Sequence, residues 1–132
     1  MAASAVLADS SFYIQLLREG HDPLRALAVA AATRDLVICG VVRCEVGRAL
    51  RPAKVQQQFH AFWDVMINVP TDNRLWEETE QMLWDLDRQG IVLPLTDIVI
   101  GCCARRVGAV VLTYDHHFSQ IPGIRVTDQL ES

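Results

Sequence analysis

The sequence predicts an α/β fold, a three-layer α/β/α sandwich with a short, mainly parallel central sheet. Short apolar runs rich in β-branched residues alternate along the chain with longer segments of helical periodicity. The runs are apolar at nearly every position, which is typical of strands that are buried on both faces of a parallel sheet. The chain of 132 residues has no internal repeat and no linker-like stretch, so we expect one domain over residues 1–132.

Two strands and three helices are expected in the first fifty residues, bounded by residues that start or stop helices. Asp9 and Asp22 stand where a side chain can accept hydrogen bonds from the free N–H groups of a helix start, and Gly20 stands where a helix can end. The expected elements are a strand over Ala5–Ala8, a helix over Phe12–Glu19, a helix from Asp22 to about Arg34, a strand over Leu36–Cys39 and a helix from about Arg43 to Leu50.

The remaining residues predict three longer helices and two strands. Apolar residues spaced three and four apart predict helices that bury one face. Gly90 and Gly108 punctuate two of these helices. The expected elements are one helix over Lys54–Val69, a helix over Asn73–Gln89, a short extended segment over Ile91–Leu95, a helix over Asp97–Val107, a strand over Ala109–Thr113, an irregular turn over Tyr114–Ile121 and a last strand over Ile124–Val126.

Composition excludes several classes of protein. The chain is 51% hydrophobic and 21% charged, which is typical of a globular protein and not of a disordered one. No apolar run approaches the roughly 20 residues that span a bilayer, and the N-terminus lacks the basic region of a signal peptide. We therefore expect a cytoplasmic protein without a membrane partner. The cysteines form no CxxC pair, so they are expected to be reduced, packed thiols; they are Cys39, Cys44, Cys102 and Cys103.

Charge is unevenly distributed along the chain. The formal net charge is −4, but six acids lie between Asp72 and Asp87 beside a single base, and the rest of the chain has a net charge of +1. Arg43, Arg48 and Arg51 form a basic stretch that could guide a nucleic-acid backbone. The alternative is that these arginines form an ordinary solvated helix face.

Four acids follow expected strands or begin expected helices. Asp9 follows the first strand, and Glu45 lies in the first turn of the helix after the second. Asp97 begins a helix after an extended segment, and Asp115 comes two residues after a strand. Open α/β sheets bind ligands at the carboxyl ends of their strands, so these side chains are expected to converge. Converging carboxylates repel one another unless a cation joins them, and oxygen ligands favour Mg²⁺ or Mn²⁺ over zinc.

Such a metal site would suit phosphodiester hydrolysis. The ion can sharpen a bound water into a nucleophile and can stabilise charge on the phosphate in the transition state. This chemistry needs no serine or cysteine nucleophile, and the chain has no arrangement typical of one. The sequence therefore favours a metal-dependent nuclease.

The same acids also have a structural explanation. Asp9, Asp97 and, more weakly, Glu45 stand where a carboxylate caps a helix or complements its dipole, and Asp115 could start a turn. The alternative hypothesis is therefore a non-catalytic α/β protein-binding module whose acids are helix caps. A phospho-accepting receiver domain is disfavoured, because Lys54 is the only lysine and does not follow a strand.

At these acids the chain resembles the PIN-domain ribonucleases, and among them the VapC-like toxins of type II toxin–antitoxin systems. The strongest match is the Thr-x-Asp-x-x-Phe ending of the segment Val110–Phe118. The resemblance runs from about Val6 to Val126. Its other segments are Val6–Ser11, Val42–Val46 and Thr96–Gly101, which hold the first three acids.

The resemblance implies a Mg²⁺- or Mn²⁺-dependent endoribonuclease that cuts tRNA or rRNA, forms a homodimer and is silenced by a cognate antitoxin protein. It implies that Asp9, Asp97 and Asp115 bind the metal directly and that Glu45 does so directly or through water. Ser10 and Thr113 would then orient a carboxylate or a bound water. The four acids, Asp9, Glu45, Asp97 and Asp115, would be the catalytic residues.

This chain departs from the family pattern at two places. Position 117, often acidic in relatives, is His117, so the resemblance leaves a fifth ligand open there. Val41 and Cys44 replace the Ser or Thr common before the second acid. His116 and His117 are adjacent on a turning chain, so their rings are expected to point apart and not to form one zinc site.

Overall fold

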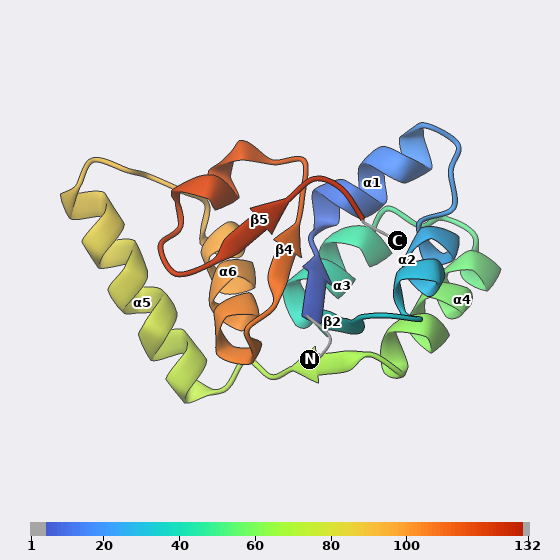
Figure 1. Cartoon of the computed structure of the whole chain (residues 1–132), viewed down its shortest axis with the longest axis horizontal. Coiled ribbons are helices and arrows are strands. Elements are labelled where there is room, and N and C mark those ends of the chain that lie inside the picture. The colour runs from blue at the N-terminus through green and yellow to red at the C-terminus, as the bar shows by residue number, and fades with distance from the viewer. Residues whose placement is uncertain (1–4, 131–132) are drawn as a thin grey trace.

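A five-stranded sheet forms the centre of the protein in the computed structural model, which describes residues 5–130 (Figure 1). The strand order is β3-β2-β1-β4-β5, and every neighbouring pair is parallel. The strands are β1 (Ala5–Ala8), β2 (Asp35–Cys39), β3 (Ile67–Val69), β4 (Val110–Leu112) and β5 (Arg125–Thr127). β1 lies at the middle of the sheet, and its residues Val6 and Leu7 are almost fully buried, as an apolar run in a parallel sheet requires.

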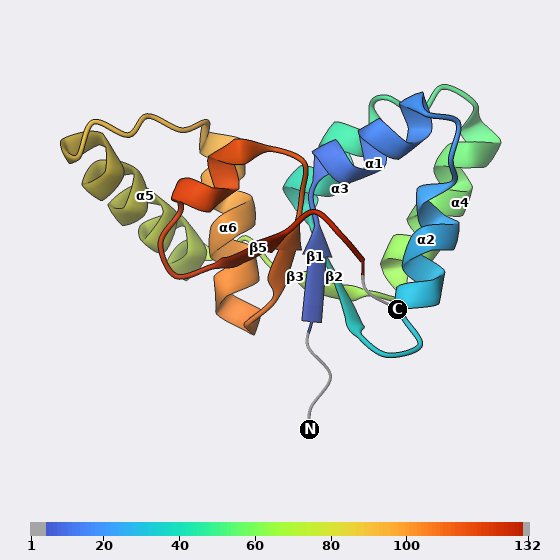
Figure 2. The ribbon, with the colours of Figure 1, turned by 45° about the horizontal axis from the view of Figure 1, so that its top comes forward.

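Helices cover both faces of this sheet. Figure 2 shows α1, α2 and α4 on one side and α5 and α6 on the other, so the predicted three-layer α/β/α class is confirmed. α6 packs against β1, β2 and β4, and α5 packs on α6. No helix among residues 5–130 is long and apolar enough to cross a membrane. The helices are α1 (Ser10–Arg18), α2 (Pro23–Ala30), α3 (Gly40–Gly47), α4 (Ala53–Asp64), α5 (Asn73–Arg88), α6 (Leu95–Val107) and the 3₁₀ helix η1 (His116–Gln120).

Aromatic side chains fill the layer between α1 and α4. Tyr13, Phe59 and Trp63 are each at most 3% exposed, and their rings meet edge to face or at a tilt. The indole N–H of Trp63 donates a hydrogen bond of 3.2 Å to the hydroxyl of Tyr13, so neither buried polar atom lacks a partner. This packing fixes α1, and with it the loop at the end of β1.

The strand order creates a crevice at the carboxyl edge of the sheet. The chain leaves β1 toward β2 and β3, then crosses back through α5 and α6 to place β4 on the other side of β1. The connections therefore diverge between β1 and β4, which is where open α/β sheets bind ligands. Asp9 stands at this point, and its backbone N–H donates a 3.0 Å hydrogen bond to the carbonyl of Leu112.

The prediction of one helix over Lys54–Val69 was wrong. α4 ends at Asp64, and the chain turns to form edge strand β3. The side-chain amide of Asn68 donates to the carbonyls of Trp63 and Met66, which stabilises this turn. A strand of three residues is too short to show its own periodicity, so the helical spacing before it masked it.

Smaller differences concern element ends. Ile91–Leu95 is not a strand, and α6 begins two residues earlier than expected, at Leu95. α3 begins at Gly40, so Glu45 lies in its second turn and not its first. The segment expected to be an irregular turn contains the 3₁₀ helix η1.

Candidate metal centre

Four carboxylates line one cleft of about 520 Å³ at the carboxyl edge of the sheet. Each comes from a different place in the chain: Asp9 follows β1, Glu45 lies on α3, Asp97 lies in the first turn of α6, and Asp115 precedes η1. The structure therefore brings together all four acids singled out from the sequence. The other residues that line this cleft are Ser10, Ser11, Ile14, Gln15, Arg18, Ile100, Tyr114 and His116.

Asp9 is held rigidly at the base of this cleft. One carboxylate oxygen accepts hydrogen bonds from the N–H of Phe12 (3.2 Å) and the hydroxyl of Ser11 (2.8 Å), and the other accepts from the hydroxyl of Thr113 (2.8 Å). Asp9 is only 3% exposed, and this burial raises its pKa although the three hydrogen bonds oppose the rise. The negative charge of Asp115 also raises the pKa of Asp9.

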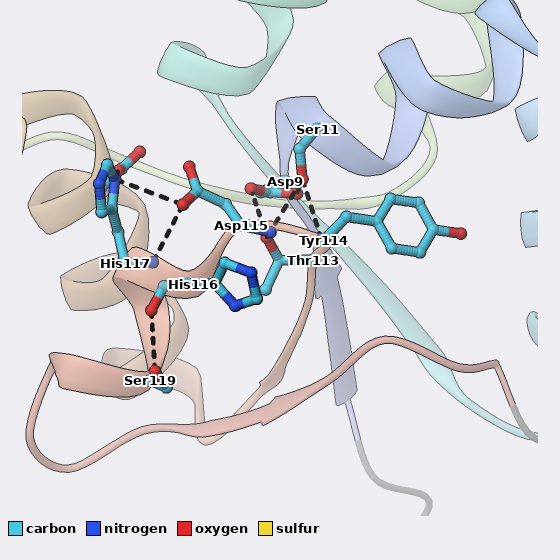
Figure 3. Close-up of polar contacts among 9 residues, drawn as sticks. Asp9, Ser11, Thr113, Tyr114, Asp115, His116, His117 and Ser119 are labelled. Carbon is cyan, nitrogen blue, oxygen red and sulfur yellow. Dashed lines mark hydrogen bonds and ion pairs between the residues drawn. The ribbon is translucent and has the colours of Figure 1, made fainter.

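Thr113 connects two of the acids. Its hydroxyl donates to Asp9 and accepts a 2.9 Å hydrogen bond from the backbone N–H of Asp115. Figure 3 shows these contacts, with Asp9, Thr113 and Asp115 side by side. The side chain of Thr113 therefore joins the carboxylate of Asp9 to the backbone of Asp115.

Asp97 and Glu45 complete the acidic lining. Burial raises the pKa of Asp97, and the nearby charges of Asp115 and Glu45 raise it further, while a hydrogen bond from His117 lowers it. The hydroxyl of Ser10 donates a short hydrogen bond to Glu45, across the gap between α1 and α3. Ser10 thus touches one acid of the cleft, as Thr113 touches another.

Helix capping accounts for only two of the four acids. Asp9 accepts from Phe12 at the start of α1, and Asp115 accepts from the N–H of His117 at the start of η1. Asp97 is the third residue of α6, whose N-cap is Pro94, and Glu45 lies in the second turn of α3. Capping therefore does not explain why Asp97 and Glu45 face the same cleft.

The side chains present fit a divalent cation. Ligand atoms of Asp97, Asp115 and His117 all lie within 4.8 Å of one another, and within residues 5–130 no other group of three or more acids, cysteines or histidines does so. Burial raises the pKa of Asp9 and of Asp97, and neighbouring negative charges raise both further; a bound cation would offset both effects. Asp9 and Glu45 share the cleft but lie outside this closest set.

His117 is the residue that sequence reasoning left out of the site. Its Nδ1 lies 2.8 Å from an oxygen of Asp97 and 3.3 Å from an oxygen of Asp115. Figure 3 shows its ring pointing away from the ring of His116, as expected for adjacent residues. The available signal in the sequence was the Asp-x-His spacing of Asp115 and His117. An Asp that caps a 3₁₀ turn accepts a hydrogen bond from the backbone N–H two residues later, and this bond brings that residue near the carboxylate.

The basic stretch predicted to guide RNA does not reach the cleft. The guanidinium of Arg43 forms an ion pair with Asp64 (3.0 Å) and a hydrogen bond with Asn68 (3.2 Å). Arg48 and Arg51 are exposed and do not line the cleft. Arg18 is the one arginine among the lining residues, and it forms no ion pair within residues 5–130.

The sequence matches the family model described as PIN domain over residues 6–124. A search of curated proteins found no match. Among solved structures, DNA-bound VapBC from Salmonella typhimurium aligns with a TM-score of 0.76 and 22% identity over 94% of this chain and 97% of that chain. VapBC2 from Rickettsia felis, bound to a promoter DNA fragment, aligns with a TM-score of 0.74 and 13% identity over 93% and 97%.

A third solved structure is VapC20 from Mycobacterium tuberculosis, described as a toxin that cleaves the sarcin–ricin loop. It aligns with a TM-score of 0.64 and 16% identity over 92% of this chain and 98% of that chain. At such low sequence identities these alignments establish a shared fold only. The chemistry depends on the residues of the site.

Proposed function

The chain belongs to the PIN domain family, and from this membership we propose that it is a divalent-metal-dependent endoribonuclease and the toxin of a toxin–antitoxin pair. The observation that carries the proposal is the cleft into which four separate elements deliver Asp9, Glu45, Asp97 and Asp115. Burying and clustering carboxylates costs free energy, so a fold that does this is typical of a functional site.

Asp97 and Asp115 would hold the ion, with Asp9 and Glu45 as further ligands, directly or through water. Mg²⁺ or Mn²⁺ bound there supplies charge stabilisation for a phosphodiester and an activated water. Thr113 keeps the carboxylate of Asp9 turned into the cleft, and Ser10 does the same for Glu45. These fixed orientations lower the reorganisation that the reaction requires.

We propose RNA as the substrate. Arg18 stands on its wall and offers a forked donor for a phosphate next to the cleaved one. VapC20 of Mycobacterium tuberculosis, which shares the fold, is described as cleaving the sarcin–ricin loop, an RNA structure. We propose structured tRNA or rRNA as the target class.

The partner class follows from the complexes that share the fold. The Salmonella typhimurium and Rickettsia felis structures are VapBC complexes bound to DNA. We propose that this chain likewise binds a cognate antitoxin protein and forms a homodimer.

The test compares RNA cleavage by wild type, Asp9→Asn and Asp97→Asn. Removing one of these carboxylates should lower cleavage in Mn²⁺ by at least about 100-fold, because each holds the ion that stabilises charge in the transition state, while circular dichroism stays unchanged. Sequencing RNA 5′ ends after induced expression identifies the target in the same comparison. Asp87→Asn, an exposed acid of α5, is the matched control and should cut like wild type.

The alternative, a protein-binding module whose acids are caps, gives opposite results. Wild type would then bind no Mn²⁺ in calorimetry, cut no RNA, and show mild, separate losses of stability in Asp9→Asn and Asp115→Asn. Equal cleavage by wild type and both cleft variants would reject the nuclease.

A further inference from the structure

A ring nitrogen and two carboxylates meet at the margin of the acidic cleft. His117 Nδ1 lies 2.8 Å from Asp97 Oδ2 and 3.3 Å from Asp115 Oδ1. Ligands at right angles around an octahedral ion, each about 2.1 Å from it, lie about 3 Å apart. These two nitrogen–oxygen distances therefore match those between neighbouring ligands on one small divalent cation, and ligand atoms of all three residues lie within 4.8 Å of one another.

The backbone holds the histidine in this place. Its N–H donates a 3.0 Å hydrogen bond to the same oxygen of Asp115 that faces the ring, as part of the cap of η1. The next residue, Phe118, is completely buried and anchors the turn. The side chain of His117 is 43% exposed, so ions and water reach the ring. The ring is thus positioned by local structure and remains accessible.

We infer that His117 is a direct ligand of the ion and that its nitrogen makes the site prefer Mn²⁺ to Mg²⁺. The inference rests on the metal dependence proposed above and adds the identity of the ion to it. Mg²⁺ is bound by oxygen ligands, whereas imidazole nitrogen is a common ligand of first-row transition metals, the series to which Mn²⁺ belongs. One nitrogen ligand among the carboxylates therefore favours Mn²⁺ over Mg²⁺ at this position.

A different role would use the same contacts. A ring N–H that only donates to Asp97 would orient that carboxylate without touching the ion, as residues around metal ligands often do. Such a residue would affect Mn²⁺ and Mg²⁺ by similar factors and would not couple magnetically to Mn²⁺. The two roles therefore differ in two measurable properties, the ion preference and the nitrogen coupling.

The first experiment is electron spin-echo spectroscopy of Mn²⁺ bound to the whole wild-type protein. A directly bound imidazole modulates the echo through its ¹⁴N nucleus, and labelling histidine with ¹⁵N should change that modulation. His117→Asn should lose the modulation. His21→Asn should keep it, because His21 is exposed and does not line the cleft. A labelled wild-type sample without nitrogen modulation rejects the inference even where a variant fails to fold.

The second experiment measures Mn²⁺ and Mg²⁺ binding by calorimetry. His117→Asn should weaken Mn²⁺ binding by roughly tenfold or more and change Mg²⁺ binding far less. His117→Asp, which supplies oxygen, should narrow the gap between the two ions. His21→Asn should leave both affinities unchanged, because this exposed residue does not line the cleft.

The outcomes separate this inference from the nuclease proposal. Bound Mn²⁺ without nitrogen modulation, or an unchanged Mn²⁺ to Mg²⁺ ratio in His117→Asn, would overturn the role of His117 while acid-dependent RNA cleavage could still stand. Failure of the wild type to bind either ion would overturn both.

Discussion

At the scale of single residues, Asp9 shows how hydrogen bonds hold a buried carboxylate in the cleft. Its carboxylate is 3% exposed and accepts three hydrogen bonds, yet burial still raises its pKa. Hydrogen bonds from Ser11, Thr113 and the N–H of Phe12 therefore only partly replace the water that the charge loses. A carboxylate left in this condition is ready to bind a cation.

This raised pKa makes stability depend on pH in a defined direction. The folded state holds a proton on Asp9 more tightly than the unfolded chain, whose value is near 3.8. The resulting stabilisation is complete below that unfolded value and is lost as pH rises through the higher folded pKa. Asp9→Asn cannot titrate there. With metal removed by chelator, its free energy of unfolding relative to wild type should therefore improve as pH rises from about 4 to 7.

Urea unfolding of both proteins across this range measures the difference. Asp97, whose pKa is also raised by burial, is present in both proteins, so its contribution cancels. A difference that stays constant with pH, or that turns against Asp9→Asn as pH rises, would contradict the assigned cause.

At the scale of elements, α6 is the part of the fold that joins core to site. It carries Asp97 in its first turn, lies against β1, β2 and β4, and is closed by Gly108 in the left-handed conformation (φ 66°). Midway along it, Gly101 lets Ile121, which follows η1, approach the helix backbone. A Cβ built at position 101 would lie 3.1 Å from Cδ1 of Ile121. The absence of a side chain at Gly101 thus allows the segment after Asp115 to pack closely.

Gly101→Ala should therefore destabilise the protein in spite of alanine's better helix propensity. The added methyl group crowds the buried side chain of Ile121, and overpacking of this kind costs about 1–3 kcal/mol. Gly47→Ala is the matched control, because a Cβ at the end of α3 meets nothing within 4 Å. It should be neutral or stabilise by up to about 1 kcal/mol. Equal urea midpoints for the two variants would show that Ile121 yields without cost.

At the scale of the whole molecule, the acids of the outer helix α5 lie apart from Arg18, the one arginine that lines the cleft. The acids between residues 72 and 87 lie on α5 and its N-cap, the helix farthest from the sheet on its side (Figure 1). Arg18 instead lines the cleft. An RNA strand would be repelled from α5 and could pair a phosphate with Arg18 at the cleft.

This distribution predicts which arginine contributes to RNA binding. Loss of one phosphate contact lowers the slope of log affinity against log salt by about 1. In an Asp9→Asn background, which prevents cleavage, Arg18→Ala should lower the slope by this amount in fluorescence anisotropy with labelled RNA. Arg43→Ala should leave the slope unchanged, because Asp64 and Asn68 already occupy its guanidinium. The reverse result would move the RNA path to the α3 side.

Much of this molecule was predictable from its sequence because the signals are local. Apolar runs, capping acids and terminal glycines predicted the order of elements, and four acids stood out because each follows a strand or opens a helix. Parallel strands end at one edge, so convergence of Asp9, Glu45, Asp97 and Asp115 on one cleft follows from topology.

Contacts between distant segments were not predictable in this way. β3 forms because it pairs with β2. These hydrogen bonds between strands determine the conformation of its three residues, although their apolar spacing fits a helix. His117 contacts Asp97 only because η1 packs on α6. Arg18, and not Arg43, lines the cleft, because the guanidinium of Arg43 is bound to Asp64 and Asn68. Periodicity and capping act within a few neighbouring residues, whereas the partner of an exposed charged or imidazole group depends on which elements the folded chain places beside it.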